Sequence, residues 1–140
     1  MNTDSTNAEP HSVKKFKMLS KGTIIALATP AGSGAIGIIR LSGPDAFEKT
    51  SFFFRSKSKQ SWNKIPSNTI VLGSFSLDQE IIDEVLLTKF KGPHSYTGEN
   101  VVEISCHGSS YIQQKIITCC LDVGINPAQA GEFTLSLIHI

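Results

Sequence analysis

Residues 23–43 read Thr23-Ile24-Ile25-Ala26-Leu27-Ala28-Thr29-Pro30-Ala31-Gly32-Ser33-Gly34-Ala35-Ile36-Gly37-Ile38-Ile39-Arg40-Leu41-Ser42-Gly43. The glycines match Gly-x-Gly-x-x-Gly, a pattern that in dinucleotide-binding proteins opens a helix whose N-terminal amides hold the pyrophosphate. Residues 35–41 are instead rich in β-branched side chains and contain a glycine, which is typical of a strand. The acidic residue expected about 20 positions further on is missing, because Asp45 and Glu48 come too early. The stretch therefore predicts a strand, a loop and a second strand, and argues against a dinucleotide site.

Length and composition indicate one globular domain. The chain has 140 residues, of which 40% are hydrophobic, enough to bury a core. A net charge of +1 argues against a broad electrostatic surface for nucleic acid or membrane, and no apolar run approaches the about 20 residues of a membrane helix. The N-terminus lacks the apolar segment of a secretory signal, so we expect a cytoplasmic protein with no membrane partner. The three cysteines form no Cys-x-x-Cys pair; we expect buried, reduced thiols and no metal site.

Residues 1–20 are expected to form a disordered extension. They begin with a polar run over residues 2–7 and include a basic run over residues 14–17 that has no helical face. The alternative is a start codon assigned too early, with Met18 as the first residue.

The rest of the chain alternates apolar runs with turn-forming residues, and these runs predict strands more often than helices. Because the strands include a hairpin, we expect an α+β fold with a mixed, mainly antiparallel sheet and two or three helices. The expected strands after residue 43 cover 69–75, 81–90 and 100–106, with a hairpin turn over 77–80, a loop over 57–64 and a second turn over 92–98.

Two helices are predicted after the first strand pair. One covers residues 46–54, with Phe47 and Phe54 on its inner face. The other runs from about residue 111 to 121, is capped by residues 107–110 and ends at 124–127. Its core-facing positions repeat every three to four residues, at Ile112, Ile116, Cys119 and Cys120.

Two local patterns resemble catalytic motifs but do not meet their requirements. Residues 43–50 differ from a P-loop at one position, where Glu48 replaces the second glycine and would repel phosphate. Cys106 and His107 are neighbours on a predicted strand, so their side chains point to opposite faces and do not form a nucleophile–base pair. His94 lies in a turn, where we expect an exposed loop histidine. We assign no catalytic residue.

Glu103 and Arg40 are charged residues within predicted strands, and each has two interpretations. Glu103 alternates onto the face opposite Val102 and Ile104, which is either a solvated face of a one-sided sheet or the acceptor for a polar ring-shaped ligand. Arg40 either lies in water or binds a carboxylate. The residue chemistry alone leaves both pairs of alternatives open.

Three segments, in their order and spacing, resemble one known family. They cover most of the chain between residues 20 and 135, and together they are far more specific than any one alone. The segments are residues 23–30 with the glycine loop and Arg40-Leu41-Ser42-Gly43, then Gly92-Pro93-His94-Ser95-Tyr96-Thr97-Gly98-Glu99-Asn100-Val101-Val102-Glu103-Ile104-Ser105-Cys106-His107-Gly108, and finally Ala130-Gly131-Glu132-Phe133-Thr134-Leu135. The chain resembles the N-terminal domain of the MnmE/TrmE family of tRNA modification GTPases.

The resemblance implies a function that the residue patterns alone do not. Family members are cytoplasmic, potassium-dependent GTPases that modify the wobble uridine of certain tRNAs together with an MnmG-type flavoprotein. Their N-terminal domain forms a homodimer and binds 5-formyltetrahydrofolate or a related folate. The family's folate-contacting arginine and glutamate match Arg40 and Glu103. The resemblance thus implies a folate-binding domain over residues 21–135.

The chain also departs from the family. Members continue from Gly-Glu-Phe-Thr into an Arg-Ala-Phe segment and an Asn-Gly-Lys segment whose lysine also contacts folate, whereas this chain reads Ser136-Leu137-Ile138-His139-Ile140. We expect residues 136–140 to be an aberrant tail and the chain to be a fragment that lacks the helical and GTPase domains. GTP, Mg²⁺ and K⁺ then belong to the full-length protein only, and the fragment alone is not expected to be catalytic. The alternatives are an interaction or dimerisation module without a ligand, and a stand-alone folate-dependent one-carbon enzyme.

Overall fold

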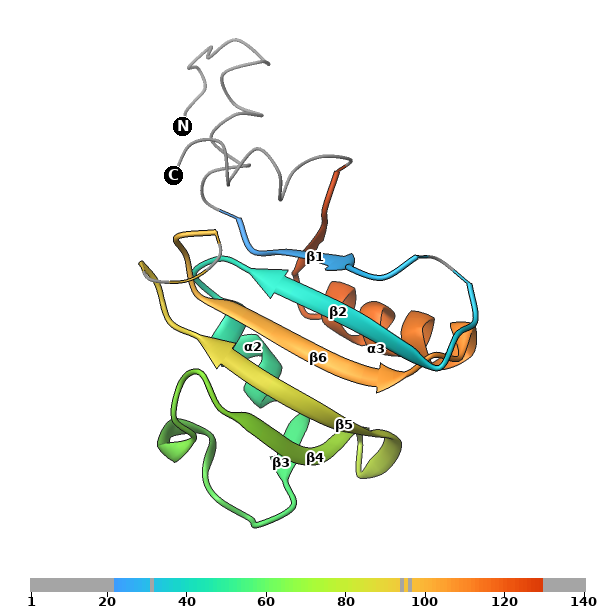
Figure 1. Ribbon diagram of the computed structural model, residues 1–140, viewed down its shortest axis with the longest axis horizontal. Coiled ribbons are helices and arrows are strands. Elements are labelled where there is room, and N and C mark those ends of the chain that lie inside the picture. The colour runs from blue at the N-terminus through green and yellow to red at the C-terminus, as the bar shows by residue number, and fades with distance from the viewer. Residues whose placement is uncertain (1–21, 31, 94, 96, 130–140) are drawn as a thin grey trace, which may run out of the picture.

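The computed structural model describes residues 22–30, 32–93, 95 and 97–129. Its described strands form one sheet in the order β3-β4-β5-β6-β2-β1-β7, and every neighbouring pair is antiparallel except β1 and β7. Helices α2 and α3 pack on one side of this sheet (Figure 1). The predicted α+β class with a mainly antiparallel sheet is confirmed. The elements are β1 (Ile24–Leu27), β2 (Ile36–Ser42), α2 (Ala46–Ser51), β3 (Phe54–Ser56), the 3₁₀ helix η2 (Trp62–Lys64), β4 (Ile70–Leu77), β5 (Glu80–Phe90), β6 (Val101–His107), α3 (Ser110–Asp122) and β7 (Asn126–Pro127).

The glycine loop joins two strands, as its sequence predicts. β1 and β2 pair antiparallel, with Ile25 opposite Leu41. The loop is held against the end of β6, because the Gly34 amide donates to the Gly108 carbonyl at 2.9 Å and the Gly108 amide donates to the Ala35 carbonyl at 3.2 Å. A Cβ atom on Gly108 would lie 2.0 Å from the Gly34 carbonyl oxygen. Glycine at position 108 therefore allows close backbone approach.

The helix predicted over residues 46–54 is too long. α2 ends at Ser51, and Phe54 lies in β3 rather than on a helix face. Phe54 pairs with Phe75 of β4, and the Ser76 amide donates to the Phe53 carbonyl at 2.9 Å. Consecutive aromatic residues favour a strand when a partner is available, and β4 supplies that partner. The predicted loop over 57–64 also contains η2, and β7 lies where only a helix end was predicted.

The β4–β5 hairpin and the second helix agree with their predictions. Asp78 and Gln79 connect the two strands, and both have positive φ, 52° and 70°, as a two-residue type I′ turn requires. α3 begins after Ser109, whose hydroxyl accepts the Ile112 amide at 3.4 Å. The predicted core positions Ile116, Cys119 and Cys120 are buried, and Ile112 packs beside them.

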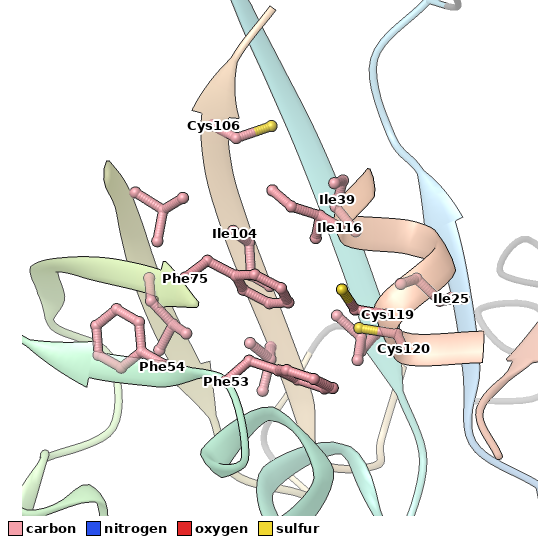
Figure 2. Packing of buried hydrophobic residues seen from close by; sticks show 14 of the residues in the cluster. Ile25, Ile39, Phe53, Phe54, Phe75, Ile104, Cys106, Ile116, Cys119 and Cys120 are labelled. Atoms are coloured by element: carbon pink, nitrogen blue, oxygen red, sulfur yellow. The ribbon is translucent and has the colours of Figure 1, made fainter. Parts of the chain in front are cut away.

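The core lies between the helices and the sheet. Phe53 and Phe75 stack at its centre with ring centroids 5.0 Å apart, and Ile116, Cys119 and Cys120 project from α3 into the same cluster (Figure 2). Cys106, Cys119 and Cys120 are free and buried, as the cysteine pattern predicts. Burial raises the pKa of Cys106 to about 11 and that of Cys120 to about 12.

The opposite face of the sheet is not covered by α2 or α3. Strand residues alternate between the two faces, so Ile39 and Ile104 point into the core while Arg40 and Glu103 belong to the other face. We call this second surface the open face. Within the described residues, no helix is both long and apolar enough to cross a lipid bilayer. The predicted extension over residues 1–20 and the tail over 136–140 lie outside the described residues.

Candidate functional site

Arg40 and Glu103 form an ion pair in the middle of the open face. They lie directly opposite each other on the neighbouring strands β2 and β6. The guanidinium Nε lies 2.9 Å from Glu103 Oε2, and NH2 lies 2.7 Å from the same oxygen. Two residues that the sequence offered separately as site candidates are therefore brought together by the register of two strands far apart in the chain.

The pair is half-buried and leaves part of the carboxylate available. The exposed side-chain fractions are 24% for Arg40 and 29% for Glu103. Both guanidinium contacts fall on Oε2, and Oε1 carries no hydrogen bond to any described residue. A carboxylate oxygen has two acceptor positions. Glu103 can therefore accept an N–H group from a ligand without losing its bond to Arg40.

The side chains directly opposite the ion pair on the open face are small. Ala26 of β1 lies opposite Arg40, and Thr88 of β5 lies opposite Glu103. Ser105 follows Glu103 on the same face of β6, because it is two residues along the strand. Short side chains leave room above the sheet beside the ion pair. The local surface therefore suits a flat group lying on the strands.

One end of the open face is bounded by the 92–98 turn, through a contact that the sequence did not predict. The hydroxyls of Ser42 and Thr97 form a buried hydrogen bond at 2.7 Å, which ties the 92–98 turn to the end of β2. Nearby, burial raises the pKa of Glu99, and a hydrogen bond from Ser42 partly opposes that rise. The Ser-x-Thr-Gly pattern at residues 95–98 predicts a turn with a free hydroxyl, but it does not identify Ser42 as the partner of Thr97.

The open face also exposes apolar side chains around the polar centre. Ile70 is 72% exposed, and Leu72 and Leu86 lie opposite each other across β4 and β5. Ile36, at the far end of β2, is exposed as well. Large exposed apolar patches commonly mark interaction sites.

Cys106 and His107 diverge, as their spacing predicts. The buried Cys106 Sγ donates to the Gly37 carbonyl at 3.5 Å, while His107 is exposed. Asp83 accepts the His107 backbone amide at 2.9 Å and lies 2.7 Å from its ring Nδ1. The Asp83–His107 contact depends on the β5–β6 pairing and was not visible in the sequence. His94 lies outside the described residues.

The segment that resembles a P-loop uses its polar side chains within the fold. The Lys49 ammonium donates to the Val123 carbonyl, and the Thr50 hydroxyl donates to the Ala46 carbonyl at 2.7 Å. Thr50 is fully buried. Both side chains therefore have structural roles here. Among the described residues, no group of three or more His, Cys, Asp or Glu side chains is arranged to hold a metal ion.

Comparison with known proteins gives a consistent result. The family model for the N-terminus of the GTP-binding protein TrmE matches residues 23–136. A tRNA modification GTPase MnmE of Christiangramia forsetii is 54% identical over 113 residues, which are 81% of this chain and 24% of that protein. The corresponding protein of Flavobacterium psychrophilum is 52% identical over 118 residues, 84% of this chain and 26% of its own length. That of Clostridioides difficile is 44% identical over 117 residues.

The chain spans about a quarter of the length of these relatives. The family match covers most of the described fold, including both strands that carry Arg40 and Glu103. The chain therefore belongs to the family of TrmE N-terminal domains.

Proposed function

We propose that this chain binds a folate, 5-formyltetrahydrofolate or a close relative, on its open face, with Arg40 and Glu103 as contacts. The observation that carries the proposal is the half-buried Arg40–Glu103 pair, in which one carboxylate oxygen accepts no hydrogen bond from a described residue, in a chain of the TrmE N-terminal family.

The chemistry of a folate suits this arrangement. The pterin ring is flat and carries N–H donors along one edge, which match the acceptor positions of Glu103 Oε1. Arg40 remains bonded to Oε2 and contributes a positive charge for a carbonyl or carboxylate of the ligand. Ala26 and Thr88 leave space above the strands on either side. The chain's own residues thus bind and orient the ligand.

The whole protein from which this chain derives is proposed to act in tRNA modification. The relatives that it matches are named tRNA modification GTPases, and this chain corresponds to about a quarter of them. We infer a cytoplasmic protein that uses GTP, Mg²⁺ and K⁺ in other domains and works with an MnmG-type flavoprotein on the wobble uridine. Complementation of a strain lacking its own MnmE by the full-length gene, read as restored wobble modification, tests this inference.

Calorimetric titration of the chain with 5-formyltetrahydrofolate tests the binding proposal. Glu103→Gln removes the charge of the acceptor, and a lost charge-assisted hydrogen bond costs roughly 1.5–3 kcal/mol, or about 10- to 150-fold in Kd. Glu84→Gln is the matched control. Glu84 lies on β5 and faces the open side of the sheet, as Glu103 does, but within the described residues it bonds only to the exposed Lys57. Absence of heat in the wild-type chain, or equal affinity in the Glu103 variant, would contradict the proposal.

A second candidate function is self-association through the open face. The exposed apolar side chains of Ile36, Ile70, Leu72 and Leu86 favour it. Sedimentation of the chain should give a dimer, and Leu86→Glu should shift it to a monomer. Tyr111→Glu serves as the control, because Tyr111 is also exposed but lies on α3, on the other side of the sheet. A wild-type monomer at high protein concentration would exclude this function for the chain.

A further inference from the structure

The open face is accessible in only one direction along the strands from the ion pair. Toward the end of β2 this face continues to Ser42 and Val101, which lie opposite each other. Both are 1% exposed, although α2 and α3 lie on the other side of the sheet (Figure 1). The 92–98 turn lies over this end, since the Thr97 hydroxyl bonds to that of Ser42 at 2.7 Å. A ligand held by the ion pair therefore cannot extend in this direction.

In the opposite direction the face stays accessible and the side chains next to the ion pair are uncharged. Ser105 is the next side chain on this face of β6 after Glu103. In the strand register it lies between Ile38 of β2 and Leu86 of β5. Ser105 and Ile38 are half-buried, and Leu86 is 44% exposed. We call the surface formed by Ser105, Ile38 and Leu86 the Ser105 strip.

The Ser105 strip places a small side chain between two large apolar ones. Neighbouring strands lie about 4.7–4.9 Å apart, so Ile38 and Leu86 stand about 9–10 Å apart on either side of β6. The apolar sides continue in Ile36, on the same face of β2, and in Leu72, which lies opposite Leu86 on β4. An aromatic ring above Ser105 would therefore contact a branched apolar side chain on each side and would bury apolar surface on both.

We propose that the Ser105 strip is a second subsite of the open-face site and binds an aromatic ring of an elongated ligand. The inference rests on the proposed folate binding and adds the direction in which the folate lies. With the pterin at the ion pair, the p-aminobenzoyl ring lies over Ser105, between Ile38 and Leu86. The glutamate part then leaves the strip at the end of β6 and extends into solvent.

The competing direction runs across the strands instead of along β6. Thr88 of β5 lies opposite Glu103, and Ile70 of β4 lies opposite Thr88. A ring over Thr88 would have the exposed Ile70 on one side and the Glu103 carboxylate on the other. It would therefore bury apolar surface against one side chain only. The Ser105 strip offers two apolar side chains and no charge, which favours the direction along β6.

Calorimetric titration with two ligands tests the direction. One ligand is 5-formyltetrahydrofolate, and the other is 5-formyl-6-methyltetrahydropterin, which keeps the pterin but lacks the benzoyl ring and the glutamate. The readout is the Kd of the pterin divided by the Kd of the folate. A change in folding or self-association that affects both ligands alike cancels in this ratio. In the wild-type chain we expect a ratio of at least about 30.

Two variants change the Ser105 strip in opposite ways. Leu86→Ala removes one apolar side and should lower the ratio about 5- to 15-fold. Ser105→Leu fills the space between the two sides and should bring the ratio close to one. Leu77→Ala is the matched control, because Leu77 is 39% exposed and lies at the β4–β5 turn, outside the strip. Ile70→Ala reports on the competing direction, and neither of these two variants should change the ratio.

The two proposals fail in distinguishable ways. If the wild-type chain binds neither ligand, folate binding on the open face and the Ser105 subsite both fall. If it binds both ligands with equal affinity, folate binding stands and the subsite is overturned. The subsite is also overturned if Ser105→Leu leaves the ratio unchanged, or if Leu77→Ala or Ile70→Ala lowers it as much as Leu86→Ala does.

Discussion

The Arg40–Glu103 pair allows a quantitative test in the free protein. In a double-mutant cycle, Arg40→Met and Glu103→Gln remove the two charges singly and together while preserving most of the side-chain volume. The geometry favours a real interaction, because two guanidinium nitrogens lie 2.9 and 2.7 Å from one carboxylate oxygen. The pairwise term of the cycle isolates this contact from the general effect of each substitution.

The expected magnitude follows from the burial of the pair. Exposed ion pairs contribute about 0.2–1 kcal/mol, whereas loss of one partner from a buried pair costs about 3–5 kcal/mol. With exposed fractions of 24% and 29%, the pair lies between these limits. Water still reaches both groups and screens the attraction. We therefore expect a coupling free energy of about 1–2 kcal/mol.

Urea unfolding of the four proteins, followed by circular dichroism, gives the coupling directly. The slope m should stay constant, since the surface exposed on unfolding does not change. A coupling near zero would refute the ion pair. A coupling above about 3 kcal/mol would show a buried structural pair, and would remove the reason to assign these residues to a ligand.

Three further predictions concern the core, the open-face boundary and the thiols. Phe75→Ala should lower the free energy of unfolding by about 3–5 kcal/mol, because Phe75 is fully buried and stacks on Phe53; urea unfolding measures the loss. Glu99→Gln should raise the melting temperature at neutral pH, because burial raises the pKa of Glu99 and disfavours its charged form in the folded state. That gain should shrink as the pH falls through the raised pKa of Glu99 toward the ordinary value of 4.5, and it should be lost below 4.5, where Glu99 is protonated in both states. The three cysteines should not react with a thiol reagent in the native protein and should react on unfolding, because burial raises the pKa of each thiol.

Each of these predictions has a control or a contrary result. Ile70→Ala, at a position 72% exposed, should change stability by less than about 0.5 kcal/mol, and a loss equal to that of Phe75→Ala would contradict the assigned core. If Glu99→Gln and the wild-type chain have the same melting temperature at every pH, the Glu99 carboxylate is well solvated. Rapid labelling of a native thiol would place that cysteine outside the core.

The sequence predicted the long, regular elements well. β2, β6 and α3 were found within a few residues, because each has a sustained apolar period that does not depend on distant partners. β3 and β7 were missed, since strands of three and two residues exist only through pairing with β4 and β1. The end of α2 was misplaced for the same reason, because Phe54 pairs with Phe75 of β4 and therefore lies in a strand.

The site was predicted residue by residue but not as a unit. Alternation alone placed Glu103 on the face opposite Ile104, and the structure agrees. The contact between Arg40 and Glu103 requires β2 and β6 to be neighbours, although 63 positions separate the two residues. The Ser42–Thr97 hydrogen bond and the Asp83–His107 contact likewise arise from long-range pairing. Local patterns carry no information on such pairings.

The most direct test of folate binding on the open face is a titration of the ¹⁵N-labelled chain with 5-formyltetrahydrofolate, followed by NMR. The proposal predicts that the largest amide shifts fall on Ala26, Arg40, Thr88 and Glu103, which meet across the neighbouring strands β1, β2, β6 and β5. The indole N–H signal of Trp62 should not move. Shifts confined to the α3 side of the sheet, or no shifts at saturating ligand, would contradict the assignment of the site.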